Sequence, residues 1–444
     1  MPMYGDELTL VYDTFSILKT GHDQTGRFFP VTFPMRGGSP GGYVYFSLPF
    51  VSIFGLSEIG VRTLSLISGL GISVLMYLLG KKIFSENIGL VAGFLTSVSL
   101  WDIYLSRGGF ETHFALFLSI LGVVCFLYKK YLPWAISWGL AILTYPTFKL
   151  TLPLMFLVIL WYVNTKDVVK NKSFMVAIII LALFGGVVVR EAFRGGGEQR
   201  FLEINIFSNG AIKEQLVQKI NEERTLSTLP DNSKPLFYNK PLEYSRVILE
   251  NYMDNISIKF LYLRGDGNPR HNPGEWGMLY LVELPLLFVG IVYLWREKRR
   301  ELVFISFWIL IAPLASMLID RAHGLRNNLM LPAFILISSY ALTKLPKKLS
   351  LLFMGLILIQ FIIVMQRVYF LAPNKFAGFW SASAKKASLE AVETRKTGKR
   401  VTLLTNIDNI EYAYPVYAKI DPNLVIDQYG KYPKVYDNVI ISDK

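Results

Sequence analysis

The sequence predicts an all-α polytopic membrane protein with about ten transmembrane helices, followed by a small extracytoplasmic α/β unit. The composition is the first indication: of 444 residues, 52% are hydrophobic and 18% are charged, against about 25% charged in soluble domains. The hydrophobic residues also gather in runs close to the length that spans a bilayer. Basic residues lie in short clusters between those runs, as in multi-pass membrane proteins.

The candidate transmembrane segments are ten apolar runs. They cover residues 60–80, 87–105, 112–128, 132–147, 149–163, 173–190, 278–295, 302–319, 328–343 and 350–368. Residues 43–56 are apolar too, but the run is short and Pro49 interrupts it. We expect an interfacial or re-entrant helix there.

The basic clusters orient these segments. If Lys81 and Lys82 are cytoplasmic, every second loop is also basic, as the positive-inside rule requires. The further cations of those loops are Lys129, Lys130, Lys166, Lys170, Lys172, Arg296, Lys298, Arg299, Arg300, Lys344, Lys347 and Lys348. Much of the net charge of +13 is thus a topology signal. We expect the lipid bilayer of the cell membrane as the partner, and no nucleic acid.

This topology divides the chain into five segments. They are an outer loop over 1–59, transmembrane helices over 60–190, a large outer loop over 191–277, transmembrane helices over 278–368, and an extracytoplasmic unit over 369–444 with strands at 401–405 and 439–442. Because the first transmembrane segment runs inward, Met1 lies outside, and we expect a further helix to precede it. The single cysteine, Cys125, excludes an intramolecular disulfide.

Charged residues of mixed type gather on the outer face, whereas the inner face is rich in lysine. All four histidines of the chain, counting His22, lie on the outer side. The candidate site residues are Asp6, Glu7, Arg36, Arg62, Arg107, Glu111, His113, Asp266, Arg270, His271, Asp320, His323 and Arg326. Ionisable groups near membrane depth are energetically expensive and usually functional.

The mixture of acids and arginines narrows the chemistry. A carboxylate serves as general base or nucleophile, and the planar guanidinium binds phosphate oxygens through two N–H groups. Transfer from a lipid-linked phosphate donor requires both. The sequence has no Walker-type phosphate loop, so ATP-driven work is not expected. It also lacks the H-x-x-x-H and H-x-x-E-H spacings of zinc enzymes, so no metal is indicated.

Five segments carry a family resemblance: GDELTLVYDTFSILKTGHDQTGRFFP, FGLSEIGVRTLSLISG, SLWDIYLSRGGFETH, GDGNPRHNPGEWGMLYLVELP and DRAHGLRN. Their order and common side resemble the GT-C class of lipid-carrier-dependent membrane glycosyltransferases. Protein O-mannosyltransferases and the aminoarabinose transferase of lipid A belong to this class. The resemblance covers most of residues 4–340, and it implies an extracytoplasmic active site.

The resemblance also implies roles for individual residues. Asp6 would be the catalytic base and Glu7 would assist it, in a single displacement that inverts the anomeric carbon. Arg107 would bind the phosphate of a polyprenyl-phosphate-linked sugar, together with Arg62, Arg36 and Arg326. The remaining candidates would line the site, and the acceptor would be a hydroxyl group. One departure is the Lys-Pro-Pro run of many relatives, because Ser39 and Pro40 stand in its place here.

Two rival functions remain open. A transporter or lipid flippase without glycosyl transfer is one, although such proteins often show inverted repeats and midplane charges, which this sequence lacks. A ligase that moves a whole glycan from a diphosphate carrier is the other. The discriminating observation is whether the outer charges converge on one cavity, and the enzymatic interpretation expects Asp6 and Arg107 to meet there.

Overall fold

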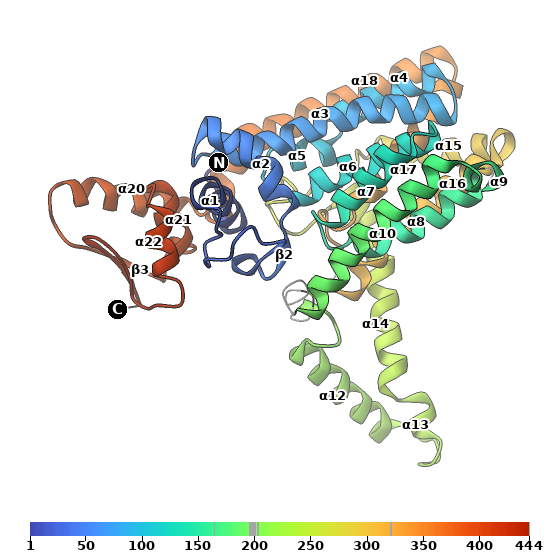
Figure 1. Ribbon diagram of the computed structural model, residues 1–444. Coiled ribbons are helices and arrows are strands. Elements are labelled where there is room, and N and C mark those ends of the chain that lie inside the picture. Colours follow the sequence, from blue (N-terminus) through green and yellow to red (C-terminus); the bar gives the residue numbers. More distant parts are fainter. Residues whose placement is uncertain (164, 195–200, 202–203, 320–321, 444) are drawn as a thin grey trace.

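The computed structural model describes every residue except 164, 195–200, 202–203, 320–321 and 444. Its architecture is a bundle of apolar helices with two attachments (Figure 1). One attachment is a helical arm that projects from the bundle. The other is a small C-terminal unit, and helix α1 (Gly5–Thr20) lies between it and the bundle. The predicted fold class is confirmed.

The N-terminal segment precedes the bundle. It contains α1, the short antiparallel pair β1 (Thr32–Phe33) and β2 (Ser39–Pro40), and α2 (Gly42–Phe54). A capping box starts α1, because the Glu7 side chain accepts from the backbone N–H of Tyr4. The helix ends at Gly21, whose φ of 75° favours glycine. Helix α2 lies where the sequence predicts a short apolar helix.

Each predicted transmembrane segment overlaps a helix of the bundle. The helices are α3 (Glu58–Ile83), α4 (Glu86–Ser97), α5 (Leu100–Ser106), α6 (Glu111–Leu127), α7 (Tyr131–Ile142), α8 (Phe148–Tyr162), α9 (Thr165–Val169), α10 (Lys172–Phe193), α15 (Glu283–Glu297), α16 (Arg299–Ile311), α17 (Leu331–Lys344) and α18 (Lys347–Gln366). Serine side chains cap the first two of these, since Ser57 accepts from the N–H of Gly60 and Ser85 from that of Ile88.

Length separates these helices into two groups. Among the described residues, 4 helices are long and apolar enough to cross a membrane, or up to 5 if the pair α4–α5, bent by 53°, forms one broken span. Others are apolar but shorter, such as α6 with 17 residues and α8 with 15. The protein is a multi-pass membrane protein.

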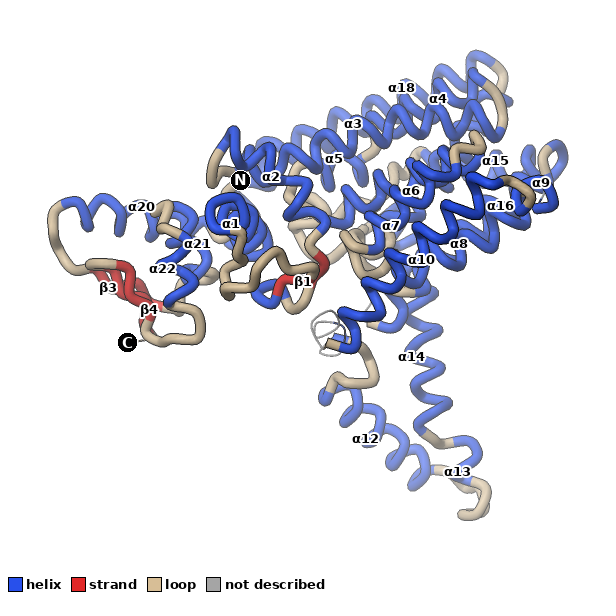
Figure 2. Tube along the Cα trace, in the orientation of Figure 1, coloured by secondary structure: helices blue, strands red, loops and turns tan. Residues whose placement is uncertain are grey.

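The arm consists of α12 (Gly210–Leu226), α13 (Lys234–Phe237) and α14 (Lys240–Asn255). The C-terminal unit contains α19 (Ala372–Lys375), α20 (Ala382–Lys396), β3 (Val401–Leu404), α21 (Ile410–Tyr417), α22 (Pro422–Asp427), β4 (Lys434–Tyr436) and β5 (Val439–Ser442). Strand β5 lies in the middle of the sheet, parallel to β3 and antiparallel to β4, as expected for an α/β unit (Figure 2).

Single helical turns complete the chain. They span Pro34–Arg36, Lys259–Leu263, Ala312–Leu314, Ser316–Leu318, Asn328–Met330, Arg367–Leu371 and Ala377–Trp380. The C-terminal unit is tied to α1, because the Tyr12 hydroxyl donates to the carbonyl of Ile420 over 2.7 Å. This contact fixes one side of the helix that carries Asp6.

Candidate functional site

Charged residues from five distant parts of the sequence line one cavity. Its volume is about 210 Å³. The predicted site residues in its lining are Asp6, Arg36, Glu111, Arg270, His271, His323 and Arg326. We call it the first cavity. Seven predicted site residues therefore converge on this cavity, but the expectation that Arg107 meets Asp6 here is wrong, because Arg107 does not line it.

Asp6 and Glu7 are adjacent in the sequence but face different surroundings. Asp6 is exposed in the first turn of α1 and lines the first cavity. Glu7 is completely buried. Because both residues lie in a rigid, capped helix, the burial of Glu7 fixes the direction in which Asp6 points.

Four hydrogen bonds from three residues hold the Glu7 carboxylate. Arg62 of α3 donates to both of its oxygens over 2.7 Å, and the backbone N–H of Gly109 donates over 2.7 Å. The N–H of Tyr4 completes the set at 3.4 Å. The Arg62 guanidinium also donates to the carbonyls of Met1 and Pro2. Glu7 and Arg62 thus satisfy each other and join α1 to α3.

Arg36 is buried beside Glu111, and its Nη2 donates to the Glu111 carboxylate. Burial alone would lower the pKa of Arg36, but the adjacent Glu111 outweighs burial and the pKa is raised. Its Nε and Nη1 are buried and have no hydrogen-bond partner among the described residues. Gly37 and Gly38 follow with φ of 62° and 77°, so a turn without side chains lines the cavity next to Arg36.

Two further arginines line the first cavity. The Nη1 of Arg326 is also buried without a hydrogen-bond partner within the part of the chain that the structure describes. Arg270 is held differently: its guanidinium lies 4.9 Å from the ring centre of Tyr4, and its Nε donates to the carbonyl of Phe379 over 2.7 Å. Unpaired buried N–H groups are costly, so Arg36 and Arg326 are suited to receive an anion.

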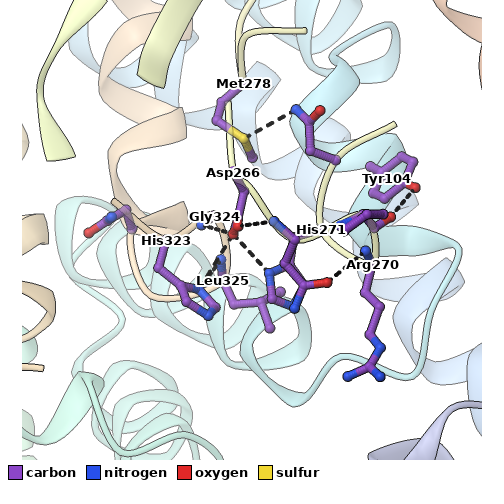
Figure 3. Close-up of polar contacts among 12 residues, drawn as sticks. Tyr104, Asp266, Arg270, His271, Met278, His323, Gly324 and Leu325 are labelled. Carbon is purple, nitrogen blue, oxygen red and sulfur yellow. Dashed lines mark hydrogen bonds and ion pairs between the residues drawn. The ribbon is translucent and has the colours of Figure 1, made fainter. Parts of the chain in front are cut away.

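Three ionisable side chains meet at one edge of the first cavity (Figure 3). The Oδ2 atom of Asp266 lies 2.8 Å from Nδ1 of His271 and 3.7 Å from Nδ1 of His323. Burial would raise the pKa of Asp266, but the hydrogen bond and positive charge of His271 outweigh it and hold the pKa below its usual range. The carboxylate is therefore ionised.

A second cavity, of about 480 Å³, lies between α3, α5 and the N-terminal residues. Arg62 and Arg107 line it. The Arg107 guanidinium lies 5.4 Å from the ring centre of Tyr104 and 5.1 Å from that of Tyr369. Asp6 and Arg107 therefore line neighbouring cavities rather than one, and Glu7 lies between them through its bonds to Arg62 and Gly109.

The other candidates are accounted for as follows. His113 is fully buried in α6, and its Nε2 contacts Asp102 of α5 at 2.9 Å. Asp320 lies outside the described residues. Asn268 and Thr147, which the sequence did not single out, also line the first cavity as neutral groups. Neutral polar residues are common in loops, so the sequence did not mark these two as site residues. The only weak sequence signal for this cavity is the Gly-rich run that follows Arg36.

Comparisons with known proteins agree with this architecture. Residues 39–189 match the family model described as dolichyl-phosphate-mannose-protein mannosyltransferase. A sequence search of curated proteins finds no significant match.

Solved structures show the same fold at low sequence identity. ArnT from Cupriavidus metallidurans bound to undecaprenyl phosphate superposes with a TM-score of 0.55 and 12% identity, over 94% of this chain and 81% of that chain. The Archaeoglobus fulgidus oligosaccharyltransferase tethered with an acceptor peptide gives 0.50 and 13%, over 94% of this chain and 59% of that chain. The chain thus spans less than two thirds of the oligosaccharyltransferase.

Proposed function

We propose that this chain, whose residues 39–189 match a protein mannosyltransferase family model and whose fold is that of ArnT, is a GT-C class glycosyltransferase that transfers one sugar from a polyprenyl-phosphate carrier to a hydroxyl acceptor. One observation supports this proposal above others. An exposed carboxylate, Asp6, shares a cavity with two arginines, Arg36 and Arg326, that each retain at least one buried nitrogen without a hydrogen-bond partner among the described residues. A base and a phosphate site are the two elements that this reaction needs.

The proposed mechanism is a single displacement. The Asp6 carboxylate takes the proton of the acceptor hydroxyl, whose oxygen forms a bond to the anomeric carbon. The bond from that carbon to the phosphate oxygen breaks, and the lipid phosphate leaves with the electron pair. Attack from the opposite face inverts the anomeric carbon. Arg36 and Arg326 donate to the phosphate as its charge grows, which lowers the barrier.

The proposed roles refine those expected from the family resemblance. Arg36 lines the same cavity as Asp6, and the Asp6 charge adds to the stronger effect of Glu111 in raising the pKa of Arg36. Arg62 is saturated by Glu7 and two carbonyls, so we assign it to the position of α1. Arg107 belongs to the second cavity, and we assign it no contact with the reacting phosphate.

The donor class is supported by two independent facts. The structure of ArnT, whose fold this chain shares, is described as bound to undecaprenyl phosphate. The second cavity is lined by exposed apolar residues of α3 such as Leu66 and Leu70, which suit a hydrocarbon chain. We propose that the carrier phosphate binds in the first cavity and its hydrocarbon chain along α3, and we place the reaction at the outer face of the cell membrane.

A transfer assay tests the proposal. The full chain in membrane vesicles is supplied with a panel of radiolabelled polyprenyl-phosphate sugars, and labelled product is measured. We expect transfer from at least one donor, and no transfer by the Asp6→Asn variant. Movement of the intact carrier across the vesicle membrane without a new glycosidic bond, unchanged in Asp6→Asn, would instead establish the flippase alternative.

A further inference from the structure

Three potential metal ligands from two loops converge on one point. The Nδ1 atoms of His271 and His323 and a carboxylate oxygen of Asp266 all lie within 4.8 Å of one another. Figure 3 shows both imidazoles directed at the Asp266 carboxylate. In a tetrahedral zinc site with bonds of about 2.0–2.2 Å, ligand atoms lie about 3.3 Å apart. The separations of 2.8 and 3.7 Å are close to that value.

One shared proton explains only one of the two contacts that the Asp266 carboxylate makes with the histidines. The proton between His271 and Asp266 accounts for their 2.8 Å contact. The Nδ1 of His323 accepts a long hydrogen bond from the N–H of Leu325 at 3.3 Å, and a cation at this point would take the place of that N–H at the nitrogen lone pair. A cation bound among the three residues would attract the carboxylate oxygen and both imidazole nitrogens, including Nδ1 of His323 at 3.7 Å from Oδ2 of Asp266.

The carboxylate is fixed by the backbone before any ion binds. The N–H of Gly324 donates to Oδ2 over 2.6 Å, and the N–H of Asn268 donates to Oδ1 over 2.8 Å. Gly324 can approach this closely because it has no side chain: a Cβ there would lie 2.8 Å from the methyl group of Met278. Hydrogen bonds of this kind orient metal-binding carboxylates.

The imidazoles are also positioned by packing. The ring of His271 lies 5.8 Å from that of Phe110, edge to face, and 4.7 Å from that of His323. Both histidines line the first cavity, whereas Asp266 is buried behind them. A cation held by the three would therefore have its remaining coordination position open to the cavity that Asp6 lines.

We propose that Asp266, His271 and His323 form a binding site for one divalent transition-metal ion of the zinc class. Two imidazole nitrogens and one carboxylate oxygen favour zinc over magnesium, which prefers an oxygen octahedron. The open position accepts an oxygen ligand, either water or a substrate oxygen. The sequence indicated no metal because the ligands lie in separate loops, without the short spacings of zinc motifs. This inference does not depend on the proposed glycosyl transfer.

Metal content tests the inference directly. The full chain is purified in detergent with a tag that contains no histidine, loaded with zinc, dialysed against a zinc buffer and analysed by elemental mass spectrometry. His271→Ala and His323→Ala are compared with His22→Ala, the matched control, because His22 contacts Thr20 and Phe28 far along the chain from these loops. Cobalt loading adds an absorption spectrum that reports the ligand geometry.

We expect about one zinc per chain in the parent and in His22→Ala. Each of the other two variants should bind zinc more weakly by over ~100-fold, since loss of a mere supporting group costs ~10- to 100-fold. Equal zinc in all four proteins, or none in the loaded parent, would overturn the site. If His271→Ala fails to fold, His323→Ala decides, because His323 is partly exposed at the cavity edge.

Discussion

The two cavities contain similar residues in different states of pairing. In the first cavity, Arg36 and Arg326 retain buried N–H groups without partners among the described residues. In the second, Arg62 makes four hydrogen bonds to protein oxygens, and Arg107 lies between two tyrosine rings. The charges of Arg62 and Arg107 are thus already used in contacts that stabilise the fold. The comparison teaches that an arginine marks a binding site only where the protein leaves its donors unsatisfied.

The largest expected effect on activity concerns Asp6, the proposed general base in the first cavity. Replacing Asp6 with Asn removes the proton acceptor but preserves size and exposure, so we expect transfer activity to fall ~10²- to 10⁴-fold. The rate of labelled product formation at saturating donor measures it. Glu58→Gln is the control, because Glu58 is a carboxylate of the second cavity and pairs with Lys385.

The control sharpens the comparison. Glu58→Gln should retain activity within a few-fold of the parent. If Glu58→Gln abolishes transfer while Asp6→Asn retains it, the reacting centre lies in the second cavity, and the roles of the two cavities are reversed.

A second large effect is on stability. Replacing Glu7 with Ala removes the counterion of Arg62, whose side chain is 17% exposed, and breaking such a largely buried ion pair costs at most about 3–5 kcal/mol. We expect the free energy of unfolding in detergent to fall by up to that amount. A loss of activity with an unchanged thermal unfolding curve would show instead that Glu7 acts in catalysis, as the family resemblance implies.

An intermediate effect separates the arginines. Arg326→Ala removes donors from the proposed phosphate site, and we expect kcat/KM for the lipid donor to fall ~10- to 100-fold, since charge-assisted hydrogen bonds contribute about 1.5–3 kcal/mol. Arg107→Ala should change it less than about threefold. Steady-state kinetics with varied donor measure both variants.

A larger loss in Arg107→Ala than in Arg326→Ala would exchange the roles proposed for the two arginines. If Arg107→Ala is the more damaging variant, the phosphate lies in the second cavity beside Tyr104 and Tyr369, as the sequence resemblance first implied.

The sequence predicts the fold well because the membrane simplifies the problem. Backbone groups must be satisfied within each apolar segment, so length and hydropathy alone locate the helices. The N-cap serines Ser57 and Ser85 even mark where two of them begin. The short helices are the exception, since α7 has only 12 residues and gains stability from packing rather than length.

The candidate site was harder to predict, because the tertiary structure decides which charged side chains pair with each other. The sequence brings Arg36, Arg62 and Arg107 to the same face, but it contains no sign that Glu7 neutralises Arg62 while Glu111 leaves part of Arg36 unpaired. His113 illustrates the same limit: a residue near the outer end of a helix turns inward and pairs with Asp102. The alternation of exposed Asp6 and buried Glu7 depends on the contact with α3.

The smallest expected effect concerns Asp13, about two turns along α1 from Asp6. Its side chain is buried, one oxygen accepts from the N–H of Gln24, and the other has no partner among the described residues. Burial raises the pKa of Asp13 to about 7, although Gln24 and Arg36 oppose the shift. Above pH ~4 the unfolded chain loses this proton while the folded chain keeps it.

The free energy of unfolding should therefore decrease as pH rises from about 4 to about 7, by at most ~1.4 kcal/mol per pH unit, and level off above. Asp13→Asn is neutral at every pH and should remove this slope, whereas Glu390→Gln, an exposed carboxylate on α20, should leave it unchanged. Thermal unfolding in detergent between pH 5 and 8 measures all three proteins. A parental slope retained in Asp13→Asn would mean that water reaches this carboxylate and that α1 packs less tightly against the first cavity than the Glu7–Arg62 pair implies.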